Sequence, residues 1–255
     1  MMIYTGSNSL LAATLLAGIL ISCDTQPTQT EADGEFSHAR NPGSSNADLL
    51  TDSDFDRLVV EIDYMEGARP TDEAIDSLRV FLVDKLQKSE IIIEEPTQIP
   101  SGGQANYTAE DVRDLEESHR STYSDTESRI LATYNVFVDG EYSDGNVLGI
   151  AYYNTSNAFF GETINSISGG LAEPSRRKVE ATVFRHEYGH LMGLVNNGTE
   201  LQSSHQDESN GAHCTDDECL MHYAFETADL FGNLFDGTIP DLNELCEADI
   251  QAVEN

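Results

Sequence analysis

The sequence predicts a mixed α/β (α+β) fold with a twisted sheet of about five strands, a helix that backs the sheet, a buried helix and a C-terminal helix. Two observations lead to this prediction. Segments rich in β-branched and aromatic residues alternate with segments whose apolar residues recur every three or four positions. The length of 255 residues with 39% hydrophobic content suits one globular domain with appendages, not two full-sized domains.

The first predicted elements form a β-α-β unit. Residues 57–64 have the composition of a strand, and an amphipathic helix is predicted from the spacing of Ile75, Leu78, Leu82 and Leu86. A short buried strand at 90–94 and a charged, mostly exposed helix from 108 to about 121 are expected to follow.

The second half is expected to complete the sheet. A strand at 129–138 is predicted to pair antiparallel with 147–153, because Asp-Gly turns lie between the two segments. A weaker strand is expected between 162 and 168, and the last helix from 240 to about 253.

The helix predicted from about 174 to 195 has two apolar sides, so we expect it to lie between the sheet and a second layer. One side carries Ala181, Phe184, Tyr188, Leu191 and Val195, and the opposite side carries Val183, His186, Glu187, His190 and Leu194. Two histidines and a glutamate on a buried face would be costly without a cation.

The N-terminus resembles a bacterial lipoprotein signal. Residues 10–21 form an apolar run of signal-peptide length, and Leu20-Ile21-Ser22-Cys23 is similar to a lipobox, in which Cys23 would be lipidated. An ordinary cleaved signal with an incidental Cys23 is the alternative. The predicted organisation is a signal peptide at 1–22, a disordered tether at 23–49 and a folded domain at 50–255.

The formal net charge of −33 excludes nucleic acids and anionic membrane surfaces as direct partners, because binding them requires clustered Lys and Arg. We expect a membrane contact only through the lipid on Cys23, and a location in the bacterial cell envelope, either periplasmic or at the cell surface.

His186-Glu187-Tyr188-Gly189-His190 is an H-E-x-x-H motif. On a helix, the i, i+4 spacing brings two imidazoles together to bind one Zn²⁺, and the glutamate faces the metal-bound water as a general base. We therefore predict His186 and His190 as metal ligands and Glu187 as a catalytic residue. The alternative is a pair of core histidines bonded to backbone carbonyls.

With Gly193, the motif becomes H-E-x-x-H-x-x-G, which resembles the metzincin clan of zinc endopeptidases. The resemblance implies a third ligand three residues later, where this chain has Asn196. Further on, the segment from His213 to Met221 resembles the H-C-x4-C-x-M segment of archaemetzincins, which implies His213 as the third ligand, with His205 as its competitor. Residues 196–212 are then an inserted loop.

The resemblance also implies a role for residues after the third ligand. Met221 would belong to the Met-turn beneath the metal, and Tyr223, as in astacins and serralysins, would be a catalytic residue that stabilises the oxyanion. A packed tyrosine is the alternative. The segment 144–151 is similar to the upper-rim strand of matrixins, which pairs with an extended substrate.

The cysteines leave a second metal ion in doubt. Archaemetzincins use four cysteines for a second, structural zinc, but only Cys214, Cys219 and Cys246 remain once Cys23 is lipidated. In an oxidising compartment, Cys214 and Cys219 could form a disulfide, and Cys246 could pair with either of them.

The sequence thus predicts a zinc metallopeptidase that hydrolyses peptide bonds in extended polypeptides. Two alternatives stay open: a lipoprotein with a structural metal that binds peptides without cutting them, and a zinc hydrolase with a non-protein substrate. Cleavage preference and oligomeric state are not determined by these patterns.

Overall fold

The computed structural model describes residues 36–171, 173–228 and 238–254. The helices are α1 (Asn46–Leu50), α2 (Asp72–Lys85), α3 (Ala109–His119), α4 (Gly161–Ser166), α5 (Arg176–Leu191) and α7 (Glu244–Glu254), with a 3-10 turn η1 (Tyr223–Phe225). The strands are β1 (Arg57–Tyr64), β2 (Glu90–Ile93), β3 (Thr97–Gln98), β4 (Asn106–Tyr107), β5 (Ile130–Val138), β6 (Glu141–Tyr142), β7 (Gly149–Tyr153) and β8 (Ser156–Phe160).

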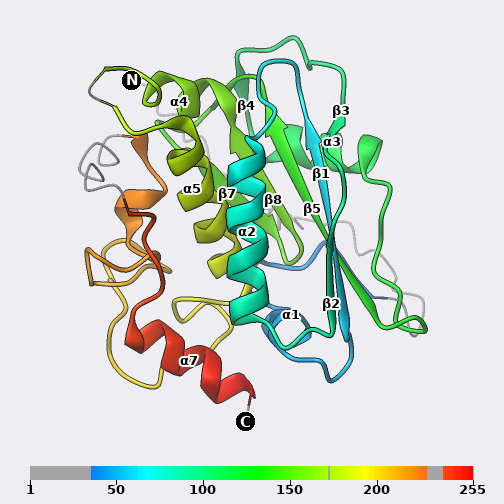
Figure 1. The fold of residues 1–255 in the computed structure, drawn as a ribbon, viewed down its shortest axis with the longest axis vertical. Helices are drawn as coiled ribbons and strands as arrows, with labels where there is room; N and C mark the ends of the chain where they lie inside the picture. Colours follow the sequence, from blue (N-terminus) through cyan, green and yellow to red (C-terminus); the bar gives the residue numbers. More distant parts are fainter. Residues whose placement is uncertain (1–35, 172, 229–237, 255) are drawn as a thin grey trace, which may run out of the picture. The chain divides into compact units, whose positions relative to one another are not determined.

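The main sheet is mixed and confirms the predicted fold class. Its strand order is β2-β1-β5-β8-β7, with β3 also paired to β1. All pairs are parallel except β7 with β8. The helices α2 and α5 lie side by side over one face of this sheet (Figure 1).

Two expectations about the second half of the sheet were wrong. The segment 147–153 pairs antiparallel with β8 and not with the strand at 129–138, and residues 162–168 largely form helix α4. The missed strand β8 is fully buried although it begins with Ser156 and Asn157. The Ser156 hydroxyl donates to Glu116 and the Asn157 side-chain NH₂ group to Asn135, so both donors find their partners only in distant residues.

The strand β2 was expected to be buried but is not. Its residues alternate between exposed and half-buried, because β2 ends the sheet and pairs on one side only with β1.

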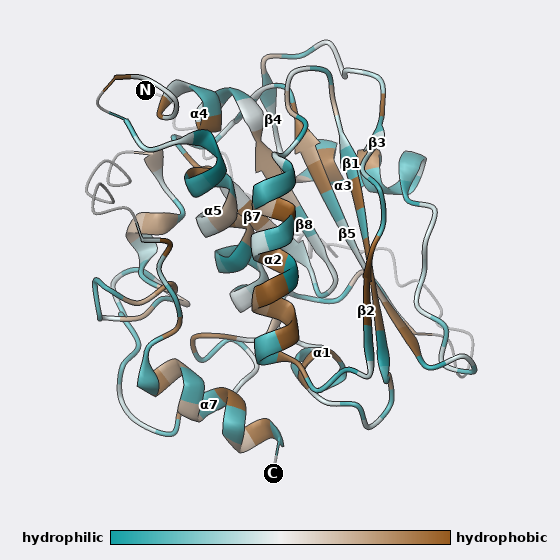
Figure 2. Ribbon diagram, viewed as in Figure 1, coloured by the Kyte–Doolittle hydropathy of each residue, from teal (hydrophilic) through white to brown (hydrophobic). Residues whose placement is uncertain are grey.

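The apolar core divides between the two faces of the sheet, as the alternation along β5 shows. Leu131 and Phe137 belong to the cluster that packs under α2 and α5, and Tyr134, Val136 and Val138 belong to the cluster that packs under α3. The helix α5 is buried over almost its whole length although much of it is hydrophilic or neutral in Figure 2, in contrast to the apolar stretches of α2. The predicted two-sided burial of α5 is therefore confirmed.

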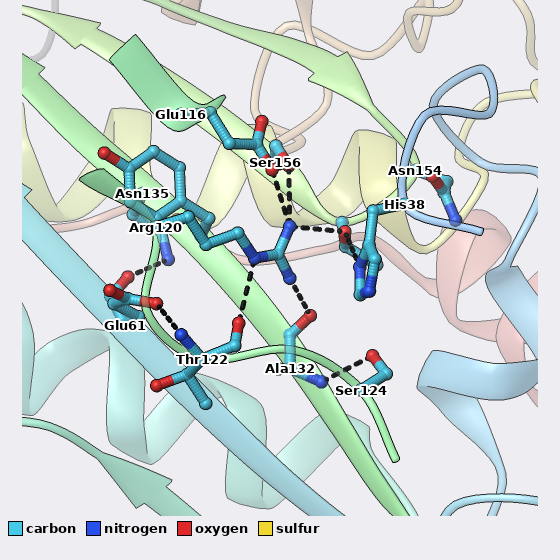
Figure 3. A network of polar contacts seen from close by, with 12 residues as sticks. His38, Glu61, Glu116, Arg120, Thr122, Ser124, Ala132, Asn135, Asn154 and Ser156 are labelled. Carbon is cyan, nitrogen blue, oxygen red and sulfur yellow. Dashed lines mark hydrogen bonds and ion pairs between the residues drawn. The ribbon is translucent and has the colours of Figure 1, made fainter. Parts of the chain in front are cut away.

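A buried arginine connects α3 to the sheet. Figure 3 shows Arg120 at the end of α3, where its guanidinium pairs with Glu116 at 2.6 Å and donates to the backbone carbonyls of Thr122 and Ala132. The neighbouring loop is held by Glu61 of β1, which accepts hydrogen bonds from Ser121 and Thr122. Because the Arg120 guanidinium and both carboxylate oxygens of Glu61 have partners, this network fixes the α3–β5 connection, although the second carboxylate oxygen of Glu116 has none among the described residues.

Part of the predicted tether, residues 36–49, belongs to the folded domain. Residues of the predicted tether form α1, with Leu49 and Leu50 buried, and the Phe36 ring packs edge-on against Phe55. The predicted signal peptide, the lipobox with Cys23 and the first part of the tether lie outside the described residues. Within the described ranges, no helix is long and apolar enough to cross a membrane.

Candidate metal centres

The helix α5 carries the H-E-x-x-H motif, and contacts at both ends fix its position. Near its start, the buried Glu180 pairs with Arg176 at 2.6 Å and accepts hydrogen bonds from Thr71, the N-cap residue of α2. The helix ends at Leu191, after which Gly193 has a φ of +79°. A side chain at Gly193 would collide with the Thr199 backbone, so only glycine allows this return of the chain.

The structure brings His186, His190 and His213 together. The Nε2 atoms of His186 and His190 lie 3.1 Å apart, and those of His186 and His213 lie 3.3 Å apart. Tetrahedral Zn²⁺ with bonds of about 2.0–2.1 Å to nitrogen places its ligand atoms about 3.3–3.4 Å from one another. The three imidazoles are therefore spaced as ligands of one ion.

The hydrogen bond of the second nitrogen in each histidine ring determines whether a proton or a lone pair faces the centre. Each Nδ1 atom bonds to a backbone carbonyl, of Leu220, Leu194 and Asn210 respectively. A carbonyl only accepts, so each Nδ1 carries the proton and each Nε2 presents a lone pair. Three lone pairs that converge at this distance repel one another, and a cation removes the repulsion.

Electrostatics keep the two helix histidines neutral, which is the form that binds a metal. Burial and the neighbouring histidines hold the pKa of His186 well below its ordinary value, and the same causes lower the pKa of His190 to about 4.

Glu187 lies on the same helix, fully buried. Neither carboxylate oxygen has a hydrogen-bond partner of normal geometry among the described residues, although the backbone N–H of Ala151 lies close enough to favour the charged form. Burial, followed by the charge of Glu226, raises the pKa of Glu187 well above its ordinary value. An unpaired buried carboxylate is costly, and such groups are typical of sites that handle protons.

A fourth candidate ligand, Glu226, was missed by sequence reasoning. Its Oε2 atom lies 3.1 Å from Nε2 of His213, and its carboxylate is within 4.8 Å of all three histidine ligand atoms. Burial alone would raise the pKa of Glu226, but the neighbouring histidines lower it, above all His213, whose Nε2 donates to the carboxylate when that ring is protonated. The same contact raises the pKa of His213. No local motif marks this residue, which follows η1 in the chain.

Met221 contacts the motif helix, whereas the Tyr223 ring contacts its neighbour His222. Met221 packs directly against Gly189 inside the motif, where a β-carbon would collide with its Sδ atom. The Tyr223 ring packs on His222 at 4.6 Å between centroids. Among the described residues, the Tyr223 hydroxyl forms no hydrogen bond with the three histidines.

The other two candidates for the third ligand lie elsewhere. Asn196 has a φ of +54° and donates to Gln206 in the loop. His205 belongs to a second group of metal-binding side chains with Cys214 and Cys246, all three buried, whose ligand atoms lie within 4.8 Å of one another.

The second group, His205, Cys214 and Cys246, is spaced close to a tetrahedral site, and Cys219, which lies outside the group, contacts it through Cys246. Nδ1 of His205 lies 3.5 Å from Sγ of Cys214 and 4.0 Å from Sγ of Cys246, and Sγ of Cys219 lies 3.6 Å from Sγ of Cys246. Zinc bonds of about 2.3 Å to sulfur and 2.0–2.1 Å to nitrogen give ligand separations of about 3.5–3.8 Å. His205 thus supplies the fourth donor that the three cysteines lack.

The three cysteines among the described residues, Cys214, Cys219 and Cys246, are all free, so none of the expected disulfides between them is formed. The 3.6 Å between the Sγ atoms of Cys219 and Cys246 far exceeds a disulfide bond of about 2.05 Å. Hydrogen bonds from the other two thiols lower the pKa of Cys214, whereas the pKa of Cys219 is raised to about 11 by its bond to Cys214. The lowered pKa of Cys214 favours its thiolate, the form that binds metals.

Comparisons with known proteins give a match to the fold alone. No protein family model matches the sequence, and neither does any curated protein. The structure is similar to a crystal structure of archaemetzincin from Methanopyrus kandleri, with a TM-score of 0.50 and 14% sequence identity, over 79% of this chain and 96% of that chain. The chain therefore has a fold similar to that of archaemetzincin, and its described residues include two groups of side chains that could hold a metal ion.

Proposed function

We propose that this protein is a zinc-dependent endopeptidase whose catalytic ion is bound by His186, His190 and His213. One observation carries the proposal: three histidine lone pairs converge beside Glu187, which is fully buried and lacks a hydrogen-bond partner of normal geometry among the described residues. A merely structural site has no use for such a carboxylate, whereas hydrolysis requires a base beside the metal.

Zinc bound at this centre would polarise the scissile carbonyl and lower the pKa of a water molecule towards 7. Glu187 accepts the proton of the attacking water and later passes it to the leaving amine. We propose that Tyr223 turns towards the developing oxyanion and donates a hydrogen bond to it.

The substrate that we propose is an extended polypeptide. The strand β7 ends the main sheet, and Glu187 lies beside it: a β-carbon at Gly149 would be 3.0 Å from Oε1 of Glu187. A peptide paired to this edge of the sheet would place its carbonyl groups near the base.

The second group would hold a structural zinc through His205, Cys214, Cys219 and Cys246. Four protein donors close a site to water, which is typical of structural zinc. This ion would connect the inserted loop to α7, which carries Cys246.

The position of Glu226 favours one competing function, a metal protein without catalysis. If Glu226 is a permanent fourth ligand, the histidine centre is also closed. The unpaired Glu187 argues against this function. Lipidation of Cys23 and attachment to the bacterial cell envelope remain part of the proposal.

Cleavage of denatured casein by the purified full chain tests the proposed function. Wild type should cleave casein, and Glu187→Gln should lose roughly 10²- to 10⁴-fold in rate, the contribution of a general base, while its zinc content by elemental analysis is unchanged. Glu200→Gln, at an exposed glutamate, is the matched control and should behave as wild type. Equal cleavage by wild type and Glu187→Gln would contradict the mechanism.

A further inference from the structure

The chain pairs with its own sheet edge beside the histidine centre. Residues 226–228, which we name the self-pairing segment, run antiparallel to residues 146–148, immediately before β7. The N–H of Leu148 donates to the Glu226 carbonyl at 2.8 Å, and the N–H of Ala228 donates to the Asn146 carbonyl at 2.8 Å. Val147 and Thr227 form the bridge between these two bonds.

This pairing has the form in which a sheet edge binds an extended peptide. Backbone hydrogen bonds to an edge provide affinity without regard to sequence, so an internal segment and a substrate use the same groups. While the self-pairing segment is in place, Leu148 N–H and Asn146 C=O are not available to another chain.

The same segment directs a carboxylate to the metal. Glu226, its first residue, lies 3.1 Å from His213 and within 4.8 Å of all three histidine ligand atoms. A carboxylate oxygen is a good fourth ligand for zinc, and that fourth position is the one hydrolysis requires for water. The self-pairing segment thus contacts both the sheet edge that is proposed to bind peptides and the fourth coordination position of the metal.

We propose that the self-pairing segment is an internal inhibitor, in which Glu226 is a displaceable fourth ligand of the histidine-bound metal. This inference rests on the proposed function and specifies its regulation. The enzyme is latent while residues 226–228 pair with 146–148, and a substrate that takes over this edge also draws Glu226 away from the metal.

The self-pairing segment is only partly buried, so few contacts oppose its displacement by a substrate. The Glu226 side chain is 26% exposed, whereas those of the ligand histidines are nearly or fully buried, so water and substrate reach the carboxylate first. Thr227 and Ala228 are half-buried. Neither belongs to the buried residues of the apolar clusters, and only Ala228 packs partly against one of them. Such a segment opens at a lower free-energy cost than the core.

The first test measures access to the metal without reference to turnover. The full chain is loaded with Co²⁺, and acetohydroxamate is titrated while the visible absorption of the metal is recorded. Glu226→Ala should bind acetohydroxamate roughly 10- to 100-fold more tightly than wild type, the range expected when a charge-assisted contact no longer competes. Glu218→Gln, at an exposed glutamate of the same acidic region, should match wild type.

The second test addresses the backbone pairing. Ala228→Pro removes the N–H that bonds to Asn146 but keeps the Glu226 side chain. Glu226→Ala should raise kcat/KM for denatured casein by roughly 10-fold or more, because a charge-assisted contact is lost. Ala228→Pro should raise it by roughly 2- to 10-fold, because a neutral backbone hydrogen bond is lost.

The outcomes separate the inhibitor from the proposed function. Equal acetohydroxamate affinity in wild type and Glu226→Ala overturns the inhibitor, whatever the activity, and so does loss of Co²⁺ from Glu226→Ala, which would make Glu226 a structural ligand. Tighter acetohydroxamate binding without casein cleavage by any variant keeps Glu226 as the displaceable ligand but contradicts the endopeptidase. Lower activity in both variants with unchanged metal content assigns Glu226 to catalysis and overturns the inhibitor.

Discussion

Nε2 of His205 lies 2.8 Å from Oδ2 of Asp249, and both side chains are almost completely buried. Asp249 also accepts a hydrogen bond from the backbone N–H of Gln202, so its carboxylate is fixed on two sides. The bond sets the protonation of His205: Nε2 carries the hydrogen, and Nδ1 faces the cysteines as a lone pair. A carboxylate behind a histidine in this way is typical of metal centres.

Asp249→Asn should weaken the second metal site by roughly 10- to 100-fold, because the carboxylate no longer fixes the ring or raises its basicity. Zinc release to a chromophoric chelator measures this affinity. Asp241→Asn, an aspartate that pairs with Lys85 outside the cluster, is the control. Unchanged zinc affinity in Asp249→Asn would mean that His205 is not a ligand.

Removal of His205 and removal of His213 should affect different ions. Wild type should contain two zinc ions per chain, and each alanine variant one. His213→Ala should lose casein cleavage, since it removes a ligand of the proposed catalytic ion. The one zinc ion that remains in His205→Ala should be bound at the histidine centre. Elemental analysis together with the casein assay distinguishes the two, and loss of the same ion in both variants would refute the assignment.

Gly189→Ala should destabilise the protein by about 1–3 kcal/mol, because the added methyl group meets Met221 where no space exists. The double variant Gly189→Ala/Met221→Ala should be less destabilised than the sum of its single variants, since the smaller side chain relieves the collision. Chemical denaturation measures all three free energies of unfolding. Strict additivity would show that the two residues do not interact.

Tyr223→Phe should lower kcat for casein by roughly 10- to 1000-fold with zinc content and stability unchanged, if its hydroxyl binds the oxyanion. Tyr153→Phe, a half-buried tyrosine at the end of β7, is the control. Unchanged kcat in Tyr223→Phe would assign this tyrosine to packing.

Asp63 should make the stability depend on pH. Burial raises the pKa of this carboxyl to about 6, although the hydrogen bond from Tyr134 partly opposes the shift. A raised pKa in the folded state means that the folded protein favours the protonated form, so its contribution is complete below about pH 4 and is lost as pH rises through 6.

Asp63→Asn removes this dependence. Relative to wild type, its free energy of unfolding should increase between pH 4 and pH 7 by up to about 3 kcal/mol. Urea denaturation at a series of pH values measures the difference, and a difference independent of pH would contradict the raised pKa.

Local patterns predicted those elements whose burial follows from their own residues. The strand β1 and the helices α2 and α5 have apolar periodicity that is visible in the sequence, and each lies where it was expected. The strand β8 could not be predicted in this way, because the partners that satisfy Ser156 and Asn157 are more than twenty positions away in the chain.

The same distinction applies to the site. His186, Glu187 and His190 share one helix face, so their spacing is enough to place them together. Glu226 and Asp249 reach their partners only through long-range packing, and no spacing rule points to them. His213 was placed through a family resemblance, and the structure brings it to the same centre.

His213 and Cys214 are consecutive residues that face different centres. A single peptide unit therefore links the position of the ligand at the reaction centre to the state of the thiols. A two-electron oxidant that joined Cys219 and Cys246 in a disulfide would withdraw sulfur from the proposed second ion, shift Cys214 and displace the neighbouring imidazole. The proposed peptidase would then be stopped by reagents that attack sulfur and never contact the histidine centre.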